Sequence, residues 1–142
     1  MGLGMAAEDV IDRIVRTMRT VAVVGLSDKP SRTSYAIASY LQERGIRIIP
    51  VNPTLAGSEV LGEKVYAAVS DIPRDIHIDV VDIFRRSEFV ASIVDEVIAR
   101  GESAIWMQVG VVDEKAAARA RAAGHAVVMD LCIGVELEER VP

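Results

Sequence analysis

The turn at the end of residues 20–25 carries residue types that can hold a phosphate. Gly25 permits a tight backbone turn, and three hydroxyl residues can cap the helix expected to follow it, namely Ser31, Thr33 and Ser34. The N-terminus of such a helix presents free N–H groups and the positive end of its dipole, which favour an anion. Lys29 and Arg32 add formal positive charge. The alternative is an ordinary strand-to-helix turn with a solvent-facing cap.

Two adjacent arginines, Arg85 and Arg86, come directly after the apolar run 78–84. The planar fork of a guanidinium group suits a phosphate. The alternative is that Arg86 opens the next helix and Arg85 pairs with a surface carboxylate such as Glu88. Together with the turn at Gly25, the arginine pair favours a phosphorylated ligand.

A dinucleotide cofactor fits these residues poorly. The first turn contains a single glycine, so the G-x-G-x-x-G pattern is absent. In a site for NAD the second strand ends in Asp or Glu, and an NADP site has an Arg nearby. Here the corresponding run ends in Asn52 and Pro53. An adenine nucleotide is still compatible with the sequence, whereas a standard NAD site is not.

Few residues offer catalytic or metal chemistry. Cys132 is the only cysteine, which excludes an internal disulfide framework and a cysteine-built zinc site, and no metal site is expected. His77 and His125 precede strands, at the opposite end of the sheet from a ligand, and are expected to be surface or turn residues. Cys132 is a possible nucleophile and Asp130 a possible base, although a structural cysteine is the commoner outcome.

The elements that must position these residues alternate between short β-branched runs and longer amphipathic segments. Strands are expected at 20–25, 46–51, 78–84, 103–108 and 126–129, and helices at 7–18, 32–44, 89–100 and 113–123, with a loop over 54–75 and a last turn or short helix from about 131. This alternation predicts an α/β fold, a doubly wound and mainly parallel five-stranded sheet with helices on both faces. Ligands of such sheets lie at the carboxyl ends of the strands.

Length and charge limit the class of protein. The chain has 142 residues, of which 51% are hydrophobic, and its formal net charge is −5. This predicts one domain over 1–142, with the helix in 1–18 packed on it, rather than a large two-domain enzyme. The negative charge argues against nucleic acid and anionic membranes as partners. Without a signal sequence or an apolar run of membrane-spanning length, a cytoplasmic monomer or small homo-oligomer is expected.

Five sequence motifs occur in order at the expected strand ends. They are residues 24–32 (VGLSDKPSR), 49–53 (IPVNP), 81–86 (VDIFRR), 104–110 (AIWMQVG) and 128–132 (VMDLC). In these motifs the chain resembles small stand-alone CoA-binding proteins of the CoA-binding-domain family, which is related to the CoA-binding domain of the succinyl-CoA synthetase alpha subunit. The resemblance covers about residues 15–138.

The resemblance implies a Rossmann-like domain that holds coenzyme A at its strand ends. The residues implied in binding are Gly25, Leu26 and Ser27 against the phosphates, Pro30 and Arg32 in the same loop, Asn52 and Pro53, the wall Phe84, Arg85 and Arg86, and Gln108 with Gly110. The sequence departs from the family pattern at Leu131, where Arg is common, and at Gly134, where a larger residue is common. CoA carries a pyrophosphate and a 3′-phosphate, which suits donors spread over several loops.

The function expected from this reasoning is binding of coenzyme A or an acyl-CoA, a small-molecule ligand, without catalysis. Two alternatives stay open. The first is an enzyme that acts on a CoA thioester or a nucleotide, with a contribution from Asp130 or Cys132. The second is a regulatory or interaction protein in which the bound nucleotide sets a conformation for a partner.

Overall fold

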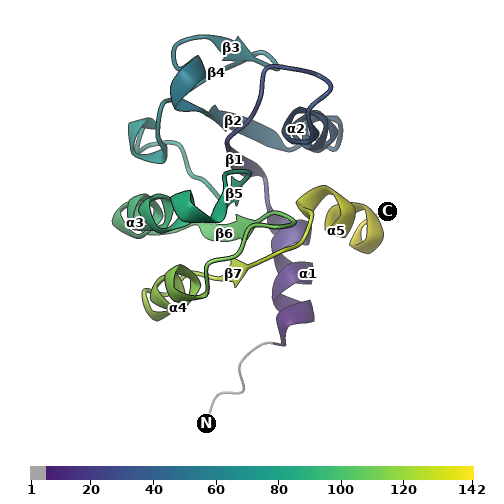
Figure 1. Ribbon diagram of the computed structural model, residues 1–142. Helices are drawn as coiled ribbons and strands as arrows, with labels where there is room; N and C mark the ends of the chain where they lie inside the picture. The colour runs from purple at the N-terminus through teal and green to yellow at the C-terminus, as the bar shows by residue number, and fades with distance from the viewer. Residues whose placement is uncertain (1–5) are drawn as a thin grey trace.

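The chain folds around a five-stranded sheet in the order β2-β1-β5-β6-β7 (Figure 1). The computed structural model describes residues 6–142. The strands are β1 (Thr20–Val24), β2 (Arg47–Val51), β5 (Val80–Ile83), β6 (Ala104–Met107) and β7 (Val127–Val128). All four pairings are parallel. The predicted doubly wound, Rossmann-like α/β sheet is therefore confirmed, and all of its strands are parallel.

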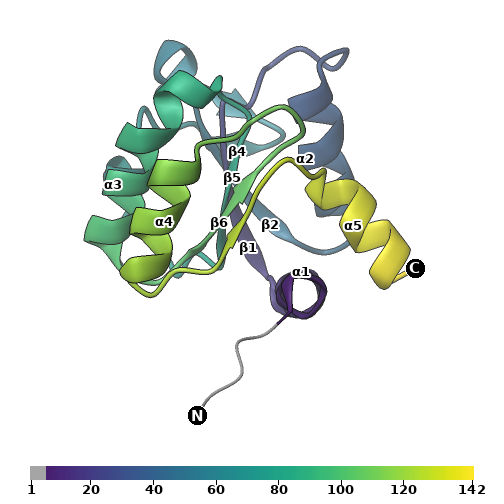
Figure 2. The ribbon, with the colours of Figure 1, turned by 60° about the horizontal axis from the view of Figure 1, so that its bottom comes forward.

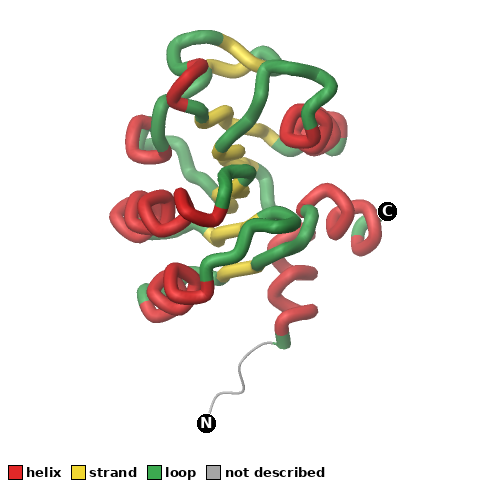
Figure 3. The backbone as a smooth tube through the Cα atoms, in the orientation of Figure 1, coloured by secondary structure: helices red, strands yellow, loops and turns green. Residues whose placement is uncertain are grey.

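Helices cover both faces of the sheet, as expected when parallel strands are joined by helical crossovers (Figures 2 and 3). One face packs against α1 (Ala7–Thr17), α2 (Thr33–Glu43) and α5 (Ile133–Arg140) through residues such as Ile11, Leu41 and Leu137. The other face packs against α3 (Val90–Arg100) and α4 (Glu114–Ala122) through Val94 and Ala117. The tail predicted as a turn or short helix is thus the eight-residue helix α5.

Strand β5 lies in the middle of the sheet and carries its one buried carboxylate. Asp82 is in register with Val23 of β1 and Trp106 of β6, and none of the three is exposed. Strands that are buried on both faces are nearly continuous apolar runs. A carboxyl group in the centre of this sheet is therefore an exception.

The segment over 54–75, expected to be a loop, contains a small antiparallel hairpin. Strands β3 (Glu59–Val60) and β4 (Glu63–Lys64) pair around Leu61 and Gly62, whose φ angles are 54° and 80°. Two positive φ angles in a two-residue connection are typical of a type I′ turn. The prediction of an uninterrupted loop was wrong here because strands of two residues show no alternation. The segment also contains short 3₁₀ turns at Pro53–Leu55 and Val69–Asp71.

Hydrogen bonds and ion pairs connect α1 to α5. The Arg16 guanidinium donates a hydrogen bond of 2.8 Å to the Arg140 carbonyl oxygen, and the Arg140 side chain pairs with Glu8 and Glu136. Helix α1 therefore packs on the domain, and residues 1–5 of the expected range 1–18 lie outside the described residues. Within residues 6–142, no helix has the length and apolar character needed to cross a membrane.

Candidate functional site

The turn after β1 brings the carboxyl ends of three strands together at Gly25. Its N–H donates to the Val51 carbonyl oxygen of β2 at 2.8 Å, and the Phe84 N–H after β5 donates to the Val24 carbonyl oxygen at 2.8 Å. Gly25 has φ +90°, and a Cβ atom at this position would lie 3.0 Å from Arg85 Cδ and 3.1 Å from the Phe84 carbonyl oxygen. Both the backbone conformation and the close approach therefore require glycine.

Two side-chain hydrogen bonds fix the conformation of the loop from residue 26 to residue 32, one of them to α2. The Ser27 N–H donates to Ser34 Oγ and the Lys29 N–H donates to Ser27 Oγ, both at 3.0 Å. Leu26 is fully buried and contributes its side chain to the core, and Pro30 is exposed. Ser27 thus stabilises the loop conformation through both its backbone N–H and its hydroxyl group.

Helix α2 begins without a side-chain cap. Its N-cap residue is Arg32, and no side chain accepts a hydrogen bond from its first turn. The prediction that Ser31, Thr33 or Ser34 caps this helix was wrong, because the Ser34 hydroxyl accepts the Ser27 N–H instead. The first N–H groups of α2 therefore have no side-chain partner, which leaves the positive end of the helix dipole unneutralised.

A cavity of about 460 Å³ lies in front of this helix end. It is lined by the loop, by the first two residues of α2 and by the residue that follows β5, namely Gly25, Ser27, Lys29, Arg32, Thr33, Ser34 and Phe84. Lys29 and Arg32 are exposed, and neither forms an ion pair with any residue in the described part of the chain. The cavity thus combines an uncapped helix N-terminus with two unpaired cationic side chains, which is the chemistry of an anion site.

Asn52 connects the second strand end to the first loop. Its side-chain amide donates to the Leu26 carbonyl oxygen at 3.1 Å, while its Oδ1 atom accepts the Thr54 N–H at 3.0 Å. Pro53 follows at the start of the 3₁₀ turn and lines a smaller hollow of about 170 Å³ together with Arg85 and Phe89. Asn52 therefore positions the Gly25 loop, and Pro53 lies in the wall of a neighbouring hollow.

The two arginines after β5 have different surroundings. The Arg85 guanidinium lies 4.1 Å from the ring centroid of Phe89, a cation–π contact, and its Cδ atom adjoins Gly25. Arg86 is largely exposed, and its Nε atom lies 3.3 Å from a Glu88 carboxylate oxygen. The carboxylate pairing considered for Arg85 is therefore made by Arg86. Phe89 was missed as a site residue because its spacing fits the next helix.

Gln108 and Gly110 lie apart from the cavity at Gly25. The Gln108 side chain is buried, and its Oε1 atom accepts the Ile133 N–H at 3.1 Å, so it fixes the start of α5. The Gly110 N–H donates to Asp130 Oδ1 at 2.7 Å. Neither residue lines the 460 Å³ cavity. Gln108 therefore positions a helix, whereas the turn at Gly110 is exposed.

Gly134 and Leu131, the two departures from the family pattern, both lie where the backbone makes a close contact. A Cβ atom on Gly134 would lie 3.0 Å from Ile37 Cδ1, so glycine lets α5 approach α2 closely. The Leu131 carbonyl oxygen accepts the Trp106 indole N–H at 2.8 Å. The backbone at Leu131 thus serves the core, whichever side chain it carries.

The histidines lie before strands, away from the cavity. His125 follows the turn at Gly124 and precedes β7, as expected, but it is buried rather than at the surface, with its Nδ1 atom 2.7 Å from the Ser103 carbonyl oxygen. His77 precedes β5 and is exposed, with Asp79 and Glu102 oxygens at 3.0 and 3.2 Å. Cys132 is half-buried at the N-cap of α5. Among residues 6–142, no three metal-ligating side chains gather into a cluster.

The fold and this edge of the sheet define a class of protein. The sheet is all parallel, a glycine turn follows β1, and an uncapped helix N-terminus lies beside cationic side chains at the carboxyl ends of the strands. This combination is typical of Rossmann-like nucleotide-binding domains.

Comparison with known proteins gives the family. Residues 19–138 match the family model of the CoA binding domain, so the chain belongs to the CoA-binding-domain family. It is 41% identical over 125 residues to the uncharacterized protein YneT of Bacillus subtilis, an alignment that covers 88% of this chain and 90% of that protein.

Two further likenesses extend this result. A protein of Pyrococcus horikoshii shares the fold over 100% of both chains, with a TM-score of 0.89 and 32% identity. The alpha subunit of the ADP-forming acetate–CoA ligase I of Pyrococcus furiosus is 34% identical over 87 residues, which are 58% of this chain and 18% of that subunit. The family resemblance predicted from the five motifs is confirmed.

Proposed function

We propose that this protein binds coenzyme A, free or as an acyl-CoA, at the carboxyl ends of β1, β2 and β5 and performs no reaction of its own. One observation carries the proposal: the first turn of α2 is uncapped and opens into a cavity that holds the unpaired side chains of Lys29 and Arg32. An anionic group placed there accepts backbone N–H bonds and meets two positive charges.

The distribution of donors favours coenzyme A over a single phosphate. Arg85 adjoins Gly25 from the other side of the turn, so cationic groups flank the turn on two sides. CoA offers a pyrophosphate and a separate 3′-phosphate to such an arrangement. The CoA binding domain match supports the same ligand, as does the likeness to a subunit of an acetate–CoA ligase. Asn52 and Pro53, with no carboxylate for the ribose, argue against NAD.

The arrangement of the reactive residues supports binding rather than catalysis. His125 is buried before β7 with its ring nitrogen bonded to a backbone carbonyl, and the Asp130 carboxylate accepts the Gly110 N–H. Both groups hold backbone in place. In this proposal Cys132, at the N-cap of α5, is structural.

Calorimetric titration with CoA, dephospho-CoA, NAD and ATP tests the ligand. We expect CoA to bind most tightly and dephospho-CoA more weakly, because it lacks the 3′-phosphate. Tight binding of NAD without a response to CoA would overturn the proposal. A separate assay for turnover of an acyl-CoA tests the second part, because turnover that is lost in Asp130→Asn or Cys132→Ser would establish an enzyme.

A matched pair of variants tests the site. Arg32→Gln is expected to weaken CoA binding by about tenfold to a hundredfold, the loss of one hydrogen bond to a charged group. Arg74→Gln removes the same charge from an exposed position before β5 and should leave CoA binding unchanged. Equal effects of the two variants would mean that only overall charge matters and that Arg32 is not in the site.

A further inference from the structure

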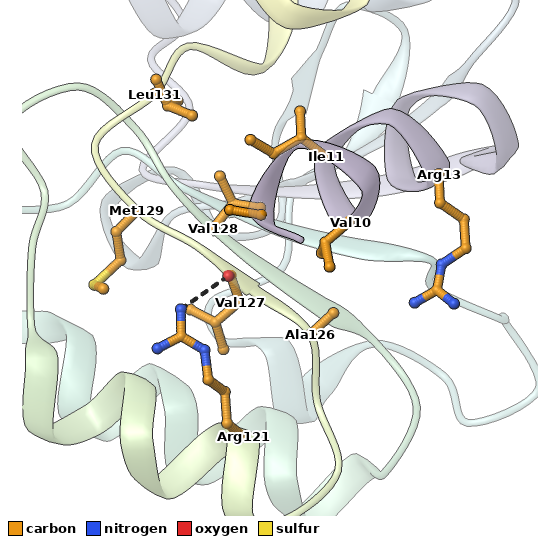
Figure 4. A pocket seen from close by; sticks show the side chains of 10 residues that line it. Val10, Ile11, Arg13, Arg121, Ala126, Val127, Val128, Met129 and Leu131 are labelled. Atoms are coloured by element: carbon orange, nitrogen blue, oxygen red, sulfur yellow. Dashed lines mark hydrogen bonds between the residues drawn. The ribbon is translucent and has the colours of Figure 1, made fainter. Parts of the chain in front are cut away.

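A second cavity, of about 690 Å³, lies on the opposite side of β5 from β1 and β2, between α1, α4 and the free edge of β7 (Figure 4). Its lining is mostly apolar and includes Val10, Ile11, Val127, Val128, Met129 and Leu131. We call it the β7 groove. Its volume is within the usual range of small-molecule sites, about 300–1,000 Å³.

Two arginines border the β7 groove, Arg13 from α1 and Arg121 from α4. Neither forms an ion pair with a residue among 6–142, although other arginines of this acidic chain do, for example Arg119 with Asp95. Two cationic groups at an apolar groove complement a ligand that has an apolar body and an anionic head.

The groove is not suited to the addition of another strand. The Ile105 N–H of β6 donates to the Ala126 carbonyl oxygen, so alternation along the strand directs the Val127 carbonyl outward. That outward carbonyl oxygen already accepts a hydrogen bond of 3.1 Å from the Arg121 guanidinium (Figure 4). Because strand pairing needs these edge groups, Arg121 blocks pairing with a peptide or with a second copy of the chain.

We propose that the β7 groove binds a fatty carboxylate, with its alkyl chain along β7 and its carboxylate at Arg121, while Arg13 adds positive charge from the α1 side of the groove. An alkyl chain needs no hydrogen bond from the strand edge, and the Arg121 guanidinium has further N–H groups that can bind the carboxylate. From Ala126 to Met129 the strand direction covers about 10 Å, so a chain of eight or more carbons is the matching class of ligand. This site is separate from the one proposed for coenzyme A.

Titration with three ten-carbon probes tests the proposal. Decanoate, decanol and decylammonium share one chain and differ in the charge of the head group. Calorimetry, or chemical shifts of the Val127 and Met129 amides, should show that decanoate binds at least tenfold more tightly than decanol, and that decylammonium binds more weakly still. Equal affinity for the three probes, or no binding of decanoate, would overturn the proposal.

Variants separate the groove from general hydrophobic binding. The double variant Arg13→Gln/Arg121→Gln should weaken decanoate binding by tenfold or more and leave decanol within about threefold. Ala126→Leu fills the groove and should weaken both, and Val10→Trp is a second filling variant if the first does not fold. Arg74→Gln is the control for loss of charge.

Two further measurements keep the outcome decisive. CoA titration of the same variants should be unchanged, so a failure of one proposal is distinguishable from a failure of the other. Light scattering that shows a dimer, together with absence of decanoate binding, would assign the groove to a second copy and overturn the proposal. Unchanged decanoate affinity in the arginine double variant would overturn it as well.

Discussion

The buried carboxyl group of Asp82 makes the strongest prediction about stability. Asp82 lies in β5 between Val23 and Trp106, and neither of its carboxylate oxygens has a hydrogen-bond partner among residues 6–142. Burial raises the pKa of this carboxyl well above its ordinary value. Both of its register neighbours are uncharged, so no adjacent cation offsets the cost of ionisation.

Asp82→Val removes the unpaired oxygens and keeps a branched side chain that suits a strand. Leaving a polar group buried without a partner costs about 1–3 kcal/mol, so this variant should raise the free energy of unfolding by about that amount at neutral pH. For a chain of this length the corresponding rise in Tm is about 3–10 °C. The change runs opposite to that of most core substitutions, which destabilise.

The pH dependence gives an independent check with a definite sign. In the unfolded chain an aspartate titrates near pH 4, whereas in the folded protein the pKa of Asp82 is raised. The contribution of Asp82 to stability is therefore fully present below about pH 4 and is lost as the pH rises through the folded pKa. Asp82→Asn cannot ionise, so its stability relative to the natural protein should increase with pH over this window.

Urea denaturation at several pH values between 4 and 8.5 measures these differences. The fluorescence of Trp106, the only tryptophan, reports unfolding, and circular dichroism provides a probe that is independent of the neighbouring carboxyl. Asp79→Asn is the matched control. It should destabilise the protein, because Asp79 Oδ2 accepts the N–H groups of Arg19 and Thr20, both at 2.9 Å.

Two results would refute the reasoning on Asp82. If Asp82→Asn follows the natural protein at every pH, Asp82 does not titrate with a raised pKa. If Asp82→Val is less stable by more than about 1 kcal/mol, the carboxyl has favourable interactions that outweigh its burial.

Three further predictions concern single positions. Gly25→Ala should cost more stability than Gly57→Ala, because both have φ near +90° (90° and 89°) but only at Gly25 would the new Cβ meet other atoms; equal costs in denaturation curves would contradict this. Arg100→Lys should lower the free energy of unfolding by about 1.5–3 kcal/mol, because the guanidinium donates to three carbonyl oxygens of the loop before β5, and an unchanged Tm would refute it. Burial lowers the pKa of His77, but the carboxylates of Glu102 and, to a smaller extent, Asp79 raise it by more, so the net shift is upward. Glu102→Gln should therefore lower the pKa of His77 in an NMR titration, and an unchanged pKa would contradict this. The stability that the ion pair between His77 and Glu102 contributes is present below about pH 6.5 and is lost as the pH rises through the raised pKa.

The main strands and helices were predictable because each has a clear period or a clear stop. The run Ile78–Phe84 is apolar enough to mark a buried strand, and glycine at 101 ends α3 with φ 108°. The hairpin over 59–64 escaped prediction because two-residue strands give no periodic signal. The burial of Asp82 was not predictable from the sequence. Strand β5 is buried on both faces, so its sequence has no alternation that would show which way the Asp82 side chain points.

The positions that depend on backbone conformation were predictable from the sequence, whereas the hydrogen-bond partners of the side chains were not. Gly25 was found because a glycine at a strand end indicates a tight turn, and the structure gives it a positive φ. The roles of Ser34 and Gln108 were not predictable, because a hydroxyl or an amide has several backbone partners within reach and tertiary packing selects one. Ser34 bonds the Ser27 N–H and leaves the helix uncapped, and Gln108 bonds the Ile133 N–H and withdraws from the surface.

Net charge and local charge have to be judged separately in this protein. A net charge of −5 disfavours polyanions, whose many charges sample the whole surface, but the field of exposed charges is screened beyond about 10 Å at moderate salt. Within that distance a small anion is affected by the few groups at its site. At both proposed sites the nearby cations, Lys29 and Arg32 or Arg13 and Arg121, form no ion pairs with residues 6–142. An acidic chain can therefore recognise small anions, provided that its own carboxylates pair elsewhere, as Asp95 does with Arg119 and Glu136 with Arg140.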